Sequence, residues 1–112
     1  MSAASAGDVL LVLTNLPGRE AALALARTLI ERKLAACVNV LGECTSVYRW
    51  QGAVETAAEI PVLIKTTTSR YAALQTAIRE LHPYELPEIV AVPLAHGLPE
   101  YLRWVAVETQ PE

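Results

Sequence analysis

Positive charge is scarce in this chain of 112 residues, in which nine lysine and arginine residues are outnumbered by twelve aspartate and glutamate residues. The two signs are intermixed along the chain, and the formal net charge is −3. Domains that bind DNA or RNA usually carry a basic face, and helices that lie on membranes carry a basic stripe. Because neither pattern is present, the sequence predicts no nucleic-acid partner and no membrane association.

Long apolar runs and cysteine pairs are missing as well. The apolar run from Val9 to Leu13 has five residues, whereas a signal peptide needs about 7 to 15 and a membrane span about 20. The two cysteines, Cys37 and Cys44, would lie about 23 Å apart on one extended strand, too far for a disulfide, whose Cα atoms lie within about 7 Å. Two free thiols are typical of a reducing compartment, so the sequence predicts a cytoplasmic protein.

The pattern that is present predicts one α+β domain over residues 8–112, after a disordered tail at residues 1–7. The expected strands are residues 8–15, 36–50, 54–68 and 88–94, and the expected helices are residues 19–34, a segment capped by Ser69 that ends before Pro83, and residues 99–107. Gln51 and Gly52 would form a two-residue hairpin turn. This β-α-β-β-α-β order with a C-terminal helix predicts a ferredoxin-like split βαβ sandwich.

Apolar residues recur at helical spacing in the first two predicted helices, which indicates that one face of each packs on the sheet. The stripes consist of Ala22, Leu25, Ala26, Leu29, Ile30 and Leu34 in the first helix and Tyr71, Leu74, Ile78 and Leu81 in the second.

The strand at residues 36–50 is long for so small a domain. Fifteen extended residues span about 50 Å, whereas a domain of this size has a radius of gyration of about 13 Å. Gly42 can bend the strand, but we still expect a long hairpin that projects from the core. Exposed strand edges tend to pair with other chains, so we expect a closed homo-oligomer in which Tyr48, Trp50 and Trp104 are interface residues.

The segment "HPYELPEIV", from His82 to Val90, is the densest in polar chemistry. His82, Glu85 and Glu88 could together hold Cu²⁺ or another divalent cation. The alternative is structural: His82 would lie at the negative end of the second helix, and the glutamates would be solvated or paired with a basic residue. The predicted topology brings this segment beside Asn15 and leaves Lys65 at the opposite edge, within reach only from a neighbouring copy.

Five segments of the chain resemble the CutA divalent-cation-tolerance family. They are "KLAACVNV", "SVYRWQG", "EIPVLIKTT", "HPYELPEIVAVPLAHG" and "YLRW", in that order. The resemblance implies a homotrimer of ferredoxin-like subunits joined by their hairpins, a response to metal ions, and a likeness to PII-type signalling trimers. Some family members bind copper through a first-strand cysteine and a paired histidine. Leu13 and Leu81 stand at those positions here and only His82 remains, so the expected copper binding is weak.

These observations predict a trimeric divalent-cation-tolerance protein with weak cation sites and no obligatory cofactor. One alternative is a PII-like module that binds a small anionic ligand between subunits through Lys65 and Tyr84. Another is an enzyme that uses Lys65, Tyr84 and Glu85 for acid–base chemistry. The sequence has no glycine-rich phosphate loop, nucleophile elbow or zinc motif, so we expect no enzymatic activity.

Overall fold

The computed structural model describes residues 8–111 and has the α+β architecture that the sequence predicts. The predicted disordered tail at residues 1–7 lies outside the described residues. In chain order, the elements are β1 (Val9–Leu16), α1 (Arg19–Glu31), β2 (Cys37–Val40), β3 (Cys44–Trp50), β4 (Ala53–Thr67), the 3₁₀ turn η1 (Thr68–Arg70), α2 (Tyr71–Leu81), β5 (Val90–Pro93) and α3 (Pro99–Glu108). Within residues 8–111, no helix has both the length and the apolar character that crossing a bilayer requires.

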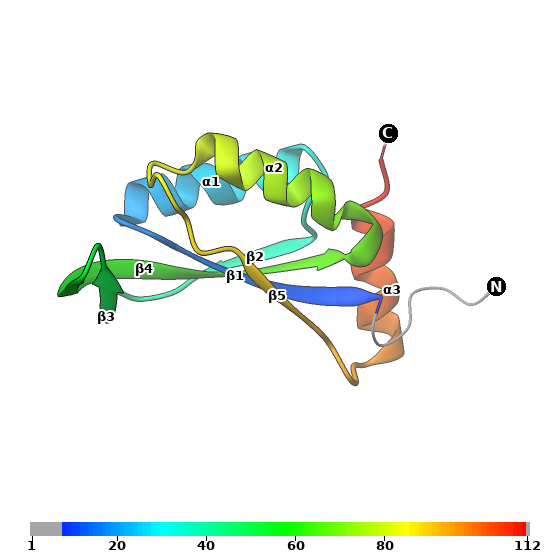
Figure 1. The fold of residues 1–112 in the computed structure, drawn as a ribbon. Coiled ribbons are helices and arrows are strands. Elements are labelled where there is room, and N and C mark those ends of the chain that lie inside the picture. The colour runs from blue at the N-terminus through cyan, green and yellow to red at the C-terminus, as the bar shows by residue number, and fades with distance from the viewer. Residues whose placement is uncertain (1–7, 112) are drawn as a thin grey trace.

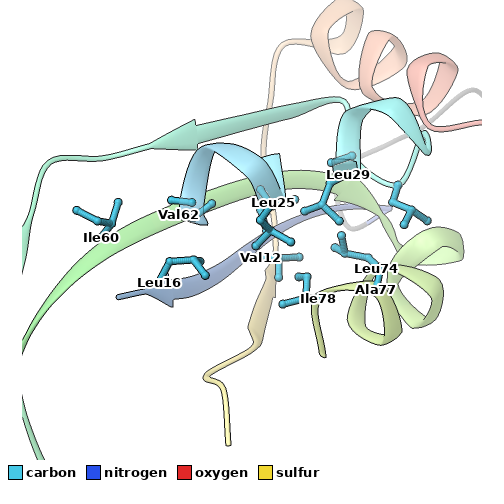
Figure 2. Close-up of a cluster of buried hydrophobic side chains, with 13 residues drawn as sticks. Val12, Leu16, Leu25, Leu29, Ile60, Val62, Leu74, Ala77 and Ile78 are labelled. Atoms are coloured by element: carbon cyan, nitrogen blue, oxygen red, sulfur yellow. The ribbon is translucent and has the colours of Figure 1, made fainter. Parts of the chain in front are cut away.

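The sheet is antiparallel, and its strands lie in the order β2-β4-β1-β5, with β3 paired to the outer half of β4. Helices α1 and α2 cover one face (Figure 1). The core lies between these helices and the sheet, where every second strand residue points inward (Figure 2). Its main members are Val12, Leu16, Val62 and Ile64 from the strands and Leu25, Leu29, Leu74 and Ile78 from the helices.

The helix boundaries correct several sequence predictions. Ser69 does not cap α2: its hydroxyl lies 3.2 Å from that of Thr67, and η1 precedes the helix. The first helix ends at Glu31, so Leu34 is buried in the connection that follows. Ile30 and Leu81 are exposed rather than packed. Ile30 lies beside Val38 at the outer edge of β2, where no further strand of the described chain continues the sheet.

The predicted strand at residues 36–50 is broken into β2 and β3. Val40 pairs with Val62, and Cys44 pairs with Glu59. Between these pairs, the three residues 41–43 therefore face only the two residues 60–61 of β4. Such an extra residue bulges and bends a strand. Pro61 contributes to the break because it has no N–H to donate, although its carbonyl accepts a hydrogen bond from the amide of Leu41 at 3.0 Å. Cys37 and Cys44 are both free, as predicted.

The hairpin of β3 and β4 projects as expected. Gln51 and Gly52 have φ values of 50° and 84°, which are typical of the two-residue turns that join twisted strands. Strand β4 runs unbroken for 15 residues. The domain is therefore elongated, with extents of 50 × 27 × 23 Å and a radius of gyration of 14.7 Å, compared with about 13 Å for an ordinary domain of this length. Figure 1 shows the hairpin at the end of the molecule opposite α3.

Helix α3 packs on the sheet face that α1 and α2 leave uncovered. Its Leu102 and Val105 form a small buried cluster with Val9, which points away from the main core. Farther along the same face, Leu13 pairs with Val90 and Leu11 pairs with Val92, and both valines are about half exposed. Within the described chain, α3 thus covers only one end of this apolar face.

Candidate functional site

His82 joins three parts of the structure at the end of α2. The residue is 7% exposed and caps the helix in an extended conformation. Its Nε2 lies 2.6 Å from the carbonyl oxygen of Asn15, and its Nδ1 lies 3.1 Å from the backbone nitrogen of Tyr84. A carbonyl can only accept and an amide can only donate, so Nε2 carries the proton and Nδ1 is the acceptor. The imidazole therefore ties the end of β1 and the following loop to α2.

The loop after His82 is held by two further hydrogen bonds. The Tyr84 hydroxyl donates to Oε2 of Glu59 at 3.0 Å, and Nδ2 of Asn15 donates to Oε1 of Glu88 at 2.8 Å. Burial, together with the nearby Glu59 carboxylate, raises the pKa of Tyr84 to about 12. Tyr84 is consequently a hydrogen-bond donor at neutral pH rather than a general base.

These residues line a pocket of about 740 Å³ at the base of the hairpin. Strand β3 and this loop form its walls, and β4 contributes Glu55 and Glu59. Tyr48 pairs directly with Glu55 across the hairpin, so their side chains share one face. The full lining is Asn15, Ser46, Val47, Tyr48, Trp50, Glu55, Glu59, Pro83, Tyr84, Glu85, Leu86 and Glu88.

The predicted metal ligands occupy different positions around this pocket. Glu85 and Glu88 line it, whereas His82 lies behind Tyr84, with a ring-to-ring distance of 4.8 Å. Both ring nitrogens of His82 already have partners. Among residues 8–111, no three histidine, cysteine, aspartate or glutamate side chains are grouped to hold a metal ion. The single chain therefore does not assemble the three residues into a ligand set.

Lys65 and Trp104 lie elsewhere. The Lys65 ammonium donates to Oδ1 of Asn39 at 2.8 Å and does not line the pocket, so only another copy could bring it there. Trp104 packs against Tyr101 on α3 in a tilted arrangement with a ring-centre distance of 5.5 Å. This helix lies at the opposite end of the molecule from the hairpin (Figure 1). Of the three predicted interface residues, Tyr48 and Trp50 lie together in the pocket wall.

Glu55 and Glu59 are pocket residues that the sequence did not predict. A signal for them was present in the hairpin turn. Once Gln51 and Gly52 are placed at the tip, strand pairing sets Glu55 opposite Tyr48 and Glu59 opposite Cys44. Alternation along a strand then puts both glutamates on the face that carries Tyr48 and Trp50.

Comparisons of the sequence and of the structure with known proteins all point to the same family. The model of the family described as CutA1 divalent ion tolerance protein matches residues 10–108. The divalent-cation tolerance protein CutA of Thermus thermophilus is 47% identical over 98 residues, covering 88% of this chain and 95% of that protein. Mouse protein CutA is 39% identical over 104 residues, or 93% of this chain, but only 59% of the mouse protein is covered. The crystal structure of CutA from Xylella fastidiosa superposes with a TM-score of 0.89 at 45% identity, covering 92% of this chain and 99% of that one.

The names of the relatives refer to different cellular compartments. A similar structure from Archaeoglobus fulgidus is described as periplasmic, and a relative from Oryza sativa is described as chloroplastic. A shared fold and sequence therefore do not fix the compartment.

Proposed function

The chain belongs to the CutA1 divalent ion tolerance protein family, and on this basis we propose that it acts in divalent-cation tolerance as a homotrimer. The observation that carries the assembly is the hairpin. Strand β3 pairs only with β4, and the outer half of β4 pairs only with β3 among the described residues. Both edges of this ribbon are therefore open, and exposed edges are normally covered by another chain. The number three comes from the family resemblance.

The apolar sheet face beyond α3 supports the same proposal. Val90 and Val92 are 51% and 54% exposed, and Leu11 and Leu13 beside them are only partly buried. Contiguous apolar surface of this kind is typical of subunit interfaces. A trimer would bury this face and the hairpin edges together.

Analytical ultracentrifugation tests the assembly. We expect the wild-type chain to sediment as a trimer at micromolar concentration. Val92→Glu places a charge on the open sheet face and should dissociate the trimer. The matched control is Ala73→Glu, which adds the same charge at an exposed position on α2 and should leave the trimer intact. A wild-type protein that sediments as a monomer would contradict the proposal.

Weak binding of Cu²⁺ or another divalent cation is the second part of the proposal. Glu85 and Glu88 face the pocket, and carboxylates are suitable ligands for divalent ions. His82, the third predicted ligand, can take part only if Nδ1 exchanges the Tyr84 amide for the ion. No obligatory cofactor and no catalytic step are part of the proposal.

Titration with Cu²⁺ and Zn²⁺ tests this part. Replacing Glu85 and Glu88 by glutamine should weaken binding about tenfold, because the side chains keep their size but lose their charge. His82→Ala, compared with the glutamine double variant, measures the histidine contribution. Identical isotherms for the wild-type protein and both variants would remove the metal role from this segment.

The remaining predictions have unequal support. A cytoplasmic location stays part of the proposal, and the free thiols of Cys37 and Cys44 support it. The alternative, a small anionic ligand bound between subunits through Lys65 and Tyr84, requires Lys65 from a neighbouring copy, because the pocket lining within the described chain has four glutamates and no lysine, arginine or histidine.

A further inference from the structure

We infer that the pocket at the hairpin base binds organic ammonium ions, in which a positively charged nitrogen carries an apolar substituent. The inference extends the proposed function, since Glu85 and Glu88 take part in both. It rests on the combination of carboxylates with an aromatic wall in one cavity. The size fits, because small-molecule pockets measure about 300–1,000 Å³, and this one measures about 740 Å³.

The charges of the lining are all of one sign. Glu55, Glu59, Glu85 and Glu88 contribute four carboxyl groups, and the part of the lining that the described chain supplies contains no basic side chain. Glu59 and Glu88 are fixed by hydrogen bonds from Tyr84 and Asn15. Within the described chain, Glu55 and Glu85 have no hydrogen-bond or ion-pair partner. Two carboxylates are thus held in place and two are available to a ligand, and any cation that enters relieves their mutual repulsion.

The walls distinguish an organic cation from a bare metal ion. Tyr48, Trp50 and Tyr84 place three aromatic rings around the cavity, and Leu86 and Pro83 add apolar surface. A metal ion gains little from such walls, whereas an ammonium group with carbon substituents is attracted to aromatic faces and buries its carbon atoms against them. The part of the chain that the structure describes also has no group of three metal-ligating side chains.

The aromatic wall is also positioned by the fold. Tyr48 and Trp50 are two residues apart on β3, so both side chains point to the same face. Tyr84 is fixed at both ends: its amide donates to Nδ1 of His82 and its hydroxyl donates to Glu59. His82 is therefore a positioning residue for this pocket, while Tyr84 and the glutamates provide the contacts.

Tryptophan fluorescence offers a direct test. The chain has two tryptophans, and Trp104→Phe leaves Trp50, in the pocket wall, as the only one. Benzyltrimethylammonium chloride is the probe, and benzyl alcohol is the neutral comparator. Both are titrated at constant ionic strength in buffer with a metal chelator, so that metal binding does not contribute. We expect saturable quenching of Trp50 by the ammonium ion, in the millimolar range, and no saturation with the alcohol.

Variants in the Trp104→Phe background separate the contribution of the carboxylates from that of the aromatic rings. Replacing Glu55 and Glu85 by glutamine should weaken binding about tenfold. The matched control replaces Glu20 and Glu108, which are exposed on α1 and α3, and should leave binding unchanged. Tyr48→Leu removes one ring and should weaken binding about two- to fivefold.

Three results would overturn the inference: no saturation with the ammonium ion, equal quenching by benzyl alcohol, or equal effects of the two pairs of glutamine substitutions. Sedimentation of the same samples reports the oligomeric state. A trimer without ammonium binding would refute the inference and leave the proposed assembly standing, whereas a monomer that binds the ion would do the reverse.

Discussion

The two halves of β4 have the same extended backbone but opposite surroundings. From Ile60 to Thr67 the strand is flanked by β1 and β2, and every second side chain is buried under the helices. From Ala53 to Glu59 it pairs only with β3, and most of its side chains are exposed. The inner half supplies the apolar burial that stabilises the domain, and the outer half supplies a pocket and open edges. One strand thus serves stability and recognition in separate segments.

The largest expected effect contrasts one residue from each half. Ile64→Ala removes a fully buried side chain from the core and should lower the free energy of unfolding by about 2–5 kcal/mol. Val54→Ala removes a side chain that is 65% exposed and should change the intrinsic stability of the subunit by about 0.5 kcal/mol or less. Denaturant unfolding, followed by circular dichroism at several protein concentrations, measures both. Equal losses at all concentrations would erase the contrast between the two halves.

A second comparison concerns two buried threonines, one on β1 and one on the inner half of β4. Thr14 and Thr66 are both fully buried, but the Thr66 hydroxyl donates to the carbonyl of Leu34 at 2.7 Å, whereas the Thr14 hydroxyl is the buried side-chain oxygen without a partner among the described residues. Thr14→Val should therefore raise stability by about 1 kcal/mol, and Thr66→Val should lower it by about 1 kcal/mol or more. Thermal unfolding of the two variants checks the opposite signs. Destabilisation of both would show that the Thr14 hydroxyl has a role in the fold.

The pH dependence of stability tests the hydrogen bond by which Tyr84, in the loop after α2, holds Glu59 on the outer half of β4. Its pKa is raised to about 12 in the folded chain, so the unfolded chain loses this proton first, near pH 10. The stability associated with the neutral hydroxyl is present below pH 10 and should be lost as the pH rises from 10 to 12. Tyr84→Phe should reduce this loss, whereas Tyr71→Phe, at another half-buried tyrosine, should keep it. Parallel stability curves for the two variants would contradict the assignment.

The smallest expected effect concerns the tip of the hairpin. Gln51 has a φ of 50°, a conformation that asparagine adopts more readily than glutamine. Gln51→Asn should stabilise the hairpin by about 0.5 kcal/mol or less, and Gln51→Val should destabilise it because branching at Cβ opposes positive φ. Melting temperatures of the two variants provide the measurement. If Gln51→Val were the more stable, the turn geometry described above would be wrong.

The hydrophobic core could be predicted from the sequence because burial leaves a periodic pattern of apolar residues. Leu25, Leu29, Leu74 and Ile78 recur at helical spacing, and all four are in the core. The break between β2 and β3 could not be predicted with the same accuracy. It depends on how residues 41–43 are accommodated opposite Pro61, and strand propensity does not encode this pairing.

The pocket was predicted less completely than the fold. Glu85 and Glu88 were identified because they lie in one short polar segment, and both line the pocket. Glu55 and Glu59 were missed because they reach the pocket through strand pairing with β3. His82 stays a predicted ligand, but in the single chain its ring nitrogens are hydrogen-bonded to Asn15 and Tyr84. Residue type alone does not reveal which side-chain atoms already have hydrogen-bond partners in the folded chain.

The uninterrupted course of β4 also restricts how this protein can change in length. Inserting one residue between Glu55 and Ile60 would turn Glu55 to the reverse side of the ribbon, since strand side chains alternate with a period of two. The same insertion within residues 41–43 falls where the chain already carries an extra residue relative to β4. Natural variants of the molecule should accordingly differ in length at that bend and keep the spacing along β4 constant.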